Sequence, residues 1–250
     1  MIDFAAISSA LTASLRLTRP PVAIRLTDSV PEGVALWSGS SPAGCRFWQE
    51  AMQRTFATAP RDHDLCAIGI HTHNLNRTES NQADLLSALQ VFAALSYVRP
   101  EDVAQIPVLQ QSPEYVVYGP LAESIARPDI VLLFVHAGQT LILSEAAQQL
   151  DRGLTPAMGR PACAVIPQAV NSGSAAISFG CCGARAYLEV LTDDVALFAI
   201  PGPKLEAFTA RIDALAKANE TLNQFHSIRK QQVASGKRPS VADSLAALSA

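Results

Sequence analysis

Charged side chains are scarce in this sequence, and aromatic side chains are scarcer still. Asp, Glu, Lys and Arg make up 16% of the 250 residues, and Phe, Trp and Tyr make up 6%. Disordered chains show the opposite balance, so a chain that is 49% hydrophobic is expected to fold around a large aliphatic core. The apolar surplus also allows a subunit interface, so a homo-oligomer is a further expectation.

Long hydrophobic runs are absent too. No apolar stretch approaches the roughly 20 residues that a membrane-spanning helix needs. The first residues have no basic segment ahead of an apolar one, so we expect no secretory signal and predict a cytoplasmic location. With a net charge of −3 and no basic stripe, the chain is not expected to bind nucleic acid.

Several common signatures are missing. The chain has no Gly-x-Gly-x-x-Gly pattern, no phosphate-loop lysine, no Gly-x-Ser-x-Gly elbow and no Cys-x-x-Cys pair. Five cysteines are present, at positions 45, 66, 163, 181 and 182. An odd number of cysteines without an export signal argues against a disulfide framework. Reduced thiols remain, as core residues, nucleophiles or metal ligands.

Hydrophobic periodicity predicts an α/β fold. Apolar residues at helical spacing predict helices over 4–15, 47–56, 82–96, 139–150 and from 205 onward. Short apolar runs predict strands at 22–26, 115–118, 130–135, 162–166, 175–179 and 195–200, and residues 61–77 are expected to be mostly loop. No linker divides the chain, so we predict one domain over 1–234, with a mixed sheet and flanking helices. The tail, 235–250, is expected to hold a short helix.

One short sequence pattern occurs twice in the chain and allows two interpretations. A strand, a turn and an Asp before an apolar strand occur around residues 117–135, and again around 178–200. This pattern is typical of a duplicated strand–helix–strand unit, but chance resemblance explains it equally well.

Cys181 has the most informative setting. A predicted strand runs into Gly180-Cys181-Cys182-Gly183, and a predicted helix through residue 191 follows, carrying Arg185. The start of a helix would favour the thiolate form of a cysteine over the thiol, and its free backbone N–H groups could hold an anion. The guanidinium of Arg185 could donate two further hydrogen bonds to that anion. A tight turn packed with small residues is the competing interpretation.

The other cysteines lie in different contexts. Cys45 and Cys66 fall in or beside predicted loops, where functional residues are common. Cys163 falls in a predicted buried strand, where plain core packing is favoured. Four separated thiolates could bind a cluster or metal ion only if distant parts of the chain converge.

The histidines give weaker signals. His63 precedes Cys66 by three residues and could act as its general base if a turn joins them. His71 and His73 would share one side of a strand as a metal pair, although an exposed loop pair is favoured. His136 is expected to be a buried, hydrogen-bonded residue, and His226 to lie on the surface of the last long helix.

The ordered set of motifs resembles a bacterial and archaeal protein family of unknown function, domain-of-unknown-function family 169. The matching segments occur in the family's order and cover roughly residues 17–205; they are 19–24, 45–48, 65–69, 117–121, 127–131, 179–185 and 194–201. The chain departs at Asp194-Val195, where an acidic pair is more usual. No activity is assigned to the family, so the resemblance implies site residues rather than a reaction.

The resemblance implies that Cys45, Cys66, Cys163 and Cys181 are family-type cysteines, with Cys182 at a more variable position. It also implies that Gly183 and Arg185 belong to the signature. Four such cysteines indicate a bound iron–sulfur cluster, of the 4Fe-4S type, with zinc as the alternative metal.

Three functions follow as hypotheses. The first is an iron–sulfur lyase, dehydratase or redox enzyme acting on a small anion, with His63 and Arg185 as catalytic residues. Its substrate would be held by Arg46, Gly180, Cys182, Gly183 and Arg185. The second is a cofactor-free thiol enzyme, with Cys181 or Cys182 as nucleophile and His63 or His71 as base. The third is a non-enzymatic protein that binds a metal or a small anion.

Overall fold

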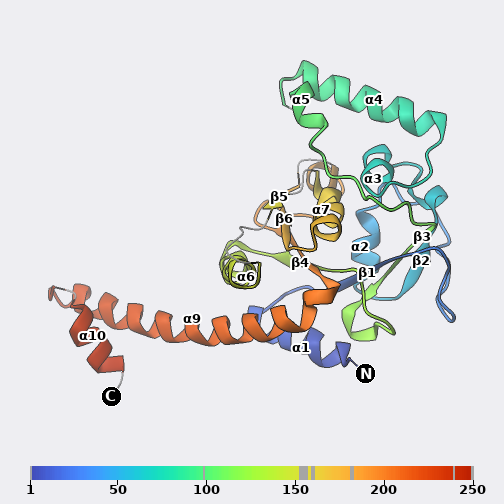
Figure 1. Cartoon of the computed structure of the whole chain (residues 1–250). Helices are drawn as coiled ribbons and strands as arrows, with labels where there is room; N and C mark the ends of the chain where they lie inside the picture. The colour runs from blue at the N-terminus through green and yellow to red at the C-terminus, as the bar shows by residue number, and fades with distance from the viewer. Residues whose placement is uncertain are drawn as a thin grey trace.

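The computed structural model describes residues 2–97, 99–151, 157–158, 161–180, 183–238 and 240–248. It shows a mixed α/β domain built on one sheet with helices on both faces (Figure 1). In the described residues the strands are β1 (Val22–Thr27), β2 (Phe56–Thr58), β3 (Tyr115–Pro120), β4 (Ile130–Val135), β5 (Ala157–Met158), β6 (Ala176–Ser178) and β7 (Ala196–Pro201).

The sheet order is β2-β3-β1-β4-β7-β6-β5. The first six of these strands pair antiparallel, and β5 pairs parallel to β6 at the edge. The duplication that the sequence allowed as one of two interpretations is not seen in the described strands. β3 and β4 are separated by β1, whereas β6 and β7 pair directly, so the two echoing segments have different topologies.

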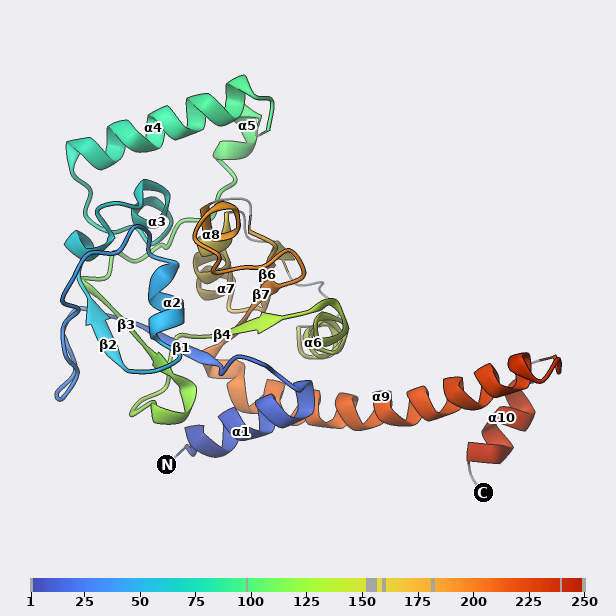
Figure 2. The same ribbon diagram turned by 180° about the vertical axis from the view of Figure 1, so that it is seen from behind.

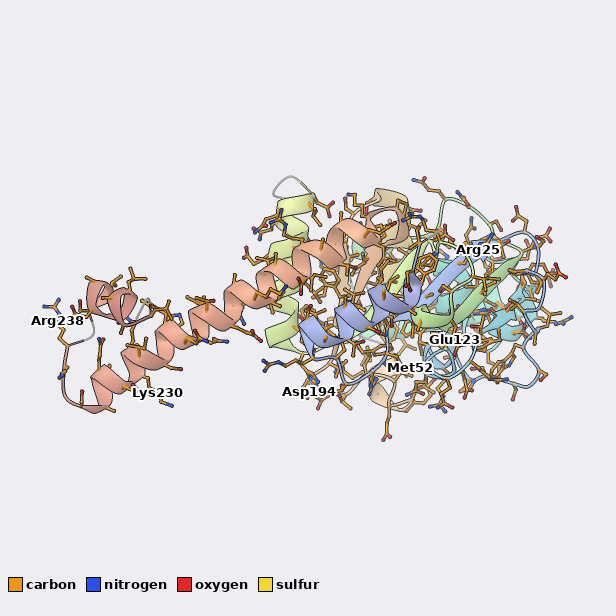
Figure 3. The ribbon with its side chains drawn as sticks, turned by 90° about the horizontal axis from the view of Figure 1, so that it is seen from below. Arg25, Met52, Glu123, Asp194, Lys230 and Arg238 are labelled. Atoms are coloured by element: carbon orange, nitrogen blue, oxygen red, sulfur yellow. The ribbon has the colours of Figure 1, made fainter. Side chains whose placement is uncertain are left out.

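The helices cover the sheet in two groups. They are α1 (Phe4–Leu15), α2 (Arg46–Glu50), α3 (Ala67–Thr72), α4 (Glu79–Ala94), α5 (Pro100–Val103), α6 (Ala137–Leu150), α7 (Val165–Ser172), α8 (Gly183–Ala186), α9 (Leu205–Ala234) and α10 (Val241–Leu248). One face carries α1, α6 and the start of α9, which run across it in Figure 3. The other face carries α2, α3, α7 and α8, with α4 and α5 beyond them (Figure 2).

Strand β4 shows why the sheet is buried on both faces. Its residues are aliphatic or aromatic throughout, and none is more than 3% exposed. Ile130, Leu132 and Phe134 point into the core beneath α2 and α7, and the alternating residues point into the core beneath α1, α6 and α9. The prediction of a strand buried on both faces at 130–135 is confirmed.

Several predicted elements are wrong. Residues 162–166 form a 3₁₀ turn, η3 (Ala162–Ala164), that leads into α7, so Cys163 is not in a strand. Residues 47–56 are not one helix, because α2 ends at Glu50 and Phe56 begins β2. Residues 61–77 hold two short helices, η1 (Pro60–His63) and α3, rather than mostly loop.

The sequence also misplaced one histidine. His136 precedes α6 with its side chain 42% exposed, and its Nδ1 lies 3.3 Å from the Asp194 carboxylate, so it is not buried. His226 lies exposed on α9, as predicted. No described helix combines the length and the apolar character that crossing a lipid bilayer requires.

Candidate functional site

A cavity of about 570 Å³ opens on the face of the sheet that carries α2, α3 and α8. Its floor is formed by residues 42–45, α3 with its flanking residues, and the turn 161–163. Its other walls come from α4, the segment 97–107 and α8. Cavities of this size hold small molecules in many proteins, so this is the candidate site.

Three of the four predicted ligand cysteines line this cavity. Cys45 precedes α2, Cys66 precedes α3, and Cys163 lies in η3. Cys45 and Cys163 are 7% and 6% exposed, and Cys66 is partly buried. The fold therefore brings together thiols that lie up to 118 positions apart in the sequence (163 − 45 = 118).

Tyr118 in β3 is buried and interacts electrostatically with all three thiols. Burial raises the pKa of the Tyr118 hydroxyl well above its usual range, and electrostatic interactions with Cys163, Cys66 and Cys45 raise it further. The Tyr118 hydroxyl therefore stays protonated near pH 7.

The short helix α3 carries much of the site. Gly69, three residues after Cys66, leaves room for its thiol, because a Cβ at Gly69 would lie 2.9 Å from Cys66 Sγ. The buried Thr72 hydroxyl lies 3.1 Å from the Gly69 carbonyl and 3.3 Å from Cys163 Sγ, and it can donate to either. One turn of helix therefore positions two of the thiols.

His73 ends this helix and also lines the cavity. Its ring is 3% exposed, and its Nδ1 lies 3.0 Å from the Gly69 carbonyl. A carbonyl only accepts, so Nδ1 carries the proton and Nε2 has a lone pair. Nε2 is buried without a hydrogen-bond partner among the described residues. Burial lowers the pKa of His73 to about 4, so the ring is neutral near pH 7.

His63, predicted as a catalytic base, is buried beside the site. Its Nε2 lies 2.9 Å from Thr58 Oγ1, whose own hydrogen goes to the Val116 carbonyl at 3.2 Å. Nε2 therefore donates, and the unprotonated Nδ1 faces Gly44, where a Cβ would lie only 3.0 Å away. Burial, and then the neighbouring His73, lower the pKa of His63 to about 3. His63 is not among the described residues that line the cavity.

The two predicted anion-holding arginines point elsewhere. Arg46 donates to Gln49 Oε1 at 2.6 Å and to the Leu188 carbonyl at 3.4 Å. Arg185 donates to the carbonyls of Phe179, Thr192 and Val195, which ties β6, α8 and β7 together. Neither arginine is among the described lining residues, so a role toward an anion stays a prediction.

The Gly-Cys-Cys-Gly segment is described only at its ends. Gly183 lines the cavity, and Gly180 has a φ of +66°, which favours glycine. Cys181 and Cys182 lie outside the described residues. The helix predicted to run through residue 191 is wrong, because α8 ends at Ala186.

The wall opposite the thiols is mainly apolar. Leu85, Leu89 and Phe92 face the cavity from α4, and Ile106 faces it from the segment after α5. Two carboxylates, Asp84 and Asp102, also line it. This wall favours a ligand with an apolar body.

No three His, Cys, Asp or Glu side chains in the described part of the chain lie in an arrangement ready to hold a single metal ion. The histidine that sequence reasoning undervalued is His73. It follows Cys66 by seven residues, and the two residues flank the six-residue helix α3. The signal was present, but a segment expected to be loop concealed it.

These features define a mixed α/β protein with a cavity lined by cysteines on one side and by apolar residues on the other. The chain belongs to the DUF169 family, described as uncharacterised ArCR, whose sequence profile matches residues 10–211. The family resemblance seen in the motifs is thereby confirmed. No curated protein and no solved structure matched the chain.

Proposed function

We propose that this protein binds an iron–sulfur cluster through Cys45, Cys66 and Cys163 and uses it on a small molecule in the adjoining cavity. The observation that carries the proposal is the convergence of three buried or partly buried thiols on one cavity from three separate segments. The sequence adds Cys181 as a predicted fourth ligand, and the neighbouring Gly183 lines the same cavity.

The donor set suits such a group. Thiolates are the ligands of iron–sulfur clusters and of structural zinc. Each thiolate of a cluster binds a separate iron atom, so cluster ligands stand farther apart than the ligands of a single ion. Zinc is the alternative metal, but these thiols would have to move closer together to bind it, because no three such donors in the described residues are arranged for a single ion.

The surroundings limit what could react there. A bound cluster would supply Lewis-acid or electron-transfer chemistry, the basis of the lyase and redox functions. The residues of α4 and the segment after α5 would hold the apolar body of a substrate and exclude water from it. A negatively charged group on that substrate remains a prediction from Arg46 and Arg185.

The test is the iron and acid-labile sulfide content of protein purified without oxygen, together with its absorption spectrum. We expect about four irons with matching sulfide per chain, and loss of most of both in Cys45→Ser and Cys163→Ser. Cys182→Ser, which lies outside the expected ligand set, serves as the matched control and should retain the cluster.

Two results would count against the cluster. Protein without iron or sulfide would overturn it, and stoichiometric zinc would replace it with the alternative metal. Protein without any metal would favour the thiol-nucleophile enzyme. In that case substitution of a single cysteine abolishes activity and the other cysteines are dispensable.

A further inference from the structure

The Nε2 atom of His73 is a buried polar atom without a hydrogen-bond partner in the described structure. A buried nitrogen left in this state costs about 1–3 kcal/mol, so folded proteins rarely keep one without a use. Its ring lines the cavity shared with the three cysteines. The ring therefore borders the cavity with one nitrogen that has no partner among the described residues.

The ring is held in the tautomer that a metal ligand needs. Its Nδ1–H donates to the Gly69 carbonyl at 3.0 Å, which leaves the lone pair of Nε2 unshared. Histidines that bind metals nearly always donate the other ring N–H to a carbonyl or carboxylate in this way. In this protein the Gly69 carbonyl already accepts that hydrogen bond from His73 Nδ1–H.

The same helix ties His73 to the thiols. The Gly69 carbonyl accepts the hydrogen bond from His73 Nδ1–H, and the absence of a side chain at Gly69 leaves room for Cys66 Sγ. Thr72, next to His73, contacts both the His73 ring at 3.2 Å and Cys163 Sγ at 3.3 Å. Residues of one short helix therefore contact the His73 ring, leave room for Cys66 Sγ and contact Cys163 Sγ.

We propose that His73, through Nε2, is the fourth protein ligand of the group bound by Cys45, Cys66 and Cys163. This inference rests on the proposed function and deepens it, because it makes the site a Cys₃His site rather than an all-cysteine one. Imidazole replaces thiolate on one iron of some iron–sulfur clusters. The inference places His73 in the position that the sequence suggested for Cys181.

The variants can separate the two candidates. His73→Asn keeps an N–H donor where Nδ1 lies, so the bond to the Gly69 carbonyl can persist while Nε2 is lost. His71→Asn is the matched control, because His71 lies on the same helix but is not among the described lining residues. Cys181→Ser tests the competing ligand.

The experiment reconstitutes each protein with Fe²⁺ and sulfide without oxygen, then reduces it. Iron and sulfide per chain are measured, and pulsed electron paramagnetic resonance records nitrogen coupling to the cluster, with histidine labelled by ¹⁵N. We expect histidine coupling in the wild type, His71→Asn and Cys181→Ser, and its loss in His73→Asn. The iron retained by His73→Asn after desalting should fall several-fold.

The outcomes distinguish the two ideas. Two results would overturn the His73 assignment and leave the proposed function standing. One is a wild-type cluster without histidine coupling. The other is loss of the cluster in Cys181→Ser together with its retention in His73→Asn. A wild type that takes up no iron overturns both. If His73→Asn fails to fold, the labelled wild type alone decides.

Discussion

Two glycines determine how closely the reactive side chains of the site can approach the backbone. A Cβ at Gly69 would meet Cys66 Sγ at 2.9 Å, and one at Gly44 would meet His63 Nδ1 at 3.0 Å. Side chains at these positions would push the sulfur or the imidazole out of place. The glycines are thus part of the site, although neither carries a reactive group.

Gly69→Ala should show this directly. Alanine in a helix normally gains up to about 1 kcal/mol over glycine, but the contact with Cys66 Sγ opposes that gain. We expect no increase in the free energy of unfolding and a several-fold loss of bound iron. Gly138→Ala in α6, where nothing lies within 4 Å of the added Cβ, is the control and should be as stable as the wild type or more so. Equal behaviour of the two variants would contradict the argument.

The buried His63 should make stability depend on pH. Its folded pKa of about 3 lies below the unfolded value of 6.5, so between these values the unfolded chain binds more protons. Stability therefore falls as pH falls from about 6.5 toward 3, by at most about 1.4 kcal/mol per pH unit for one proton.

His63→Gln can keep a donor to Thr58 through its side-chain amide while removing the titration. In urea unfolding of metal-free protein from pH 7 to 4, the variant should lose less stability per pH unit than the wild type. Parallel pH curves for the two proteins would show that His63 does not titrate in this way.

At the scale of elements, the side chain of Arg185 links the two ends of the connection from β6 through α8 to β7. Arg185 donates to carbonyls at both ends of this connection, and it lies near Asp193, at 3.8 Å. The described part of the connection contains only four helical residues, and Arg19 and Gln49 also donate to its carbonyls from other parts of the chain. The Arg185 guanidinium therefore holds the carbonyls of Phe179 and Val195 close together.

Arg185→Met retains bulk and removes these bonds. Hydrogen bonds from charged groups are worth about 1.5–3 kcal/mol, so we expect a loss of that order in the free energy of unfolding. Denaturant unfolding measures it, with Arg46→Met, an exposed arginine near the same site, as a control expected to change little. A fully stable Arg185→Met with impaired ligand binding would instead favour the predicted role in holding an anion.

At the scale of the whole molecule, α9 extends far beyond the sheet. Its buried residues, Leu205, Phe208 and Ile212, all lie in its first third, where it packs against α1 and α6. The remainder projects from the domain and carries α10, as the positions of Lys230 and Arg238 show (Figure 3). The family match ends at residue 211, so it covers the start of α9, with the buried Leu205 and Phe208, and not the projecting part.

A chain that ends after Asn223 should therefore keep its fold. We expect a melting temperature within about 4 °C of the wild type, because changes at exposed positions cost little, and unchanged cluster content. Phe208→Ala, which empties a fully buried position of the same helix, should cost about 3–5 kcal/mol. A large drop in melting temperature on truncation would show that the arm has a stabilising partner, such as a second copy of the chain.

Much of the fold followed from local pattern. Residues 130–135 form a continuous apolar run and residues from 205 onward have apolar side chains at helical spacing, and β4 and α9 formed there as predicted. The prediction at 162–166 failed because a short run of small apolar residues fits a buried helix as well as a strand. The packing of η3 and α7 against the sheet decided between them.

The sequence by itself determined the thiols as the functional candidates, the α/β class and the family. Only the tertiary structure decided that Cys45, Cys66 and Cys163 share one cavity with His73. It also decided that Arg185 donates its hydrogen bonds to backbone carbonyls. The physical reason is that these contacts join residues far apart in the chain. Their closeness depends on strand order and helix packing, which no local pattern of residues encodes.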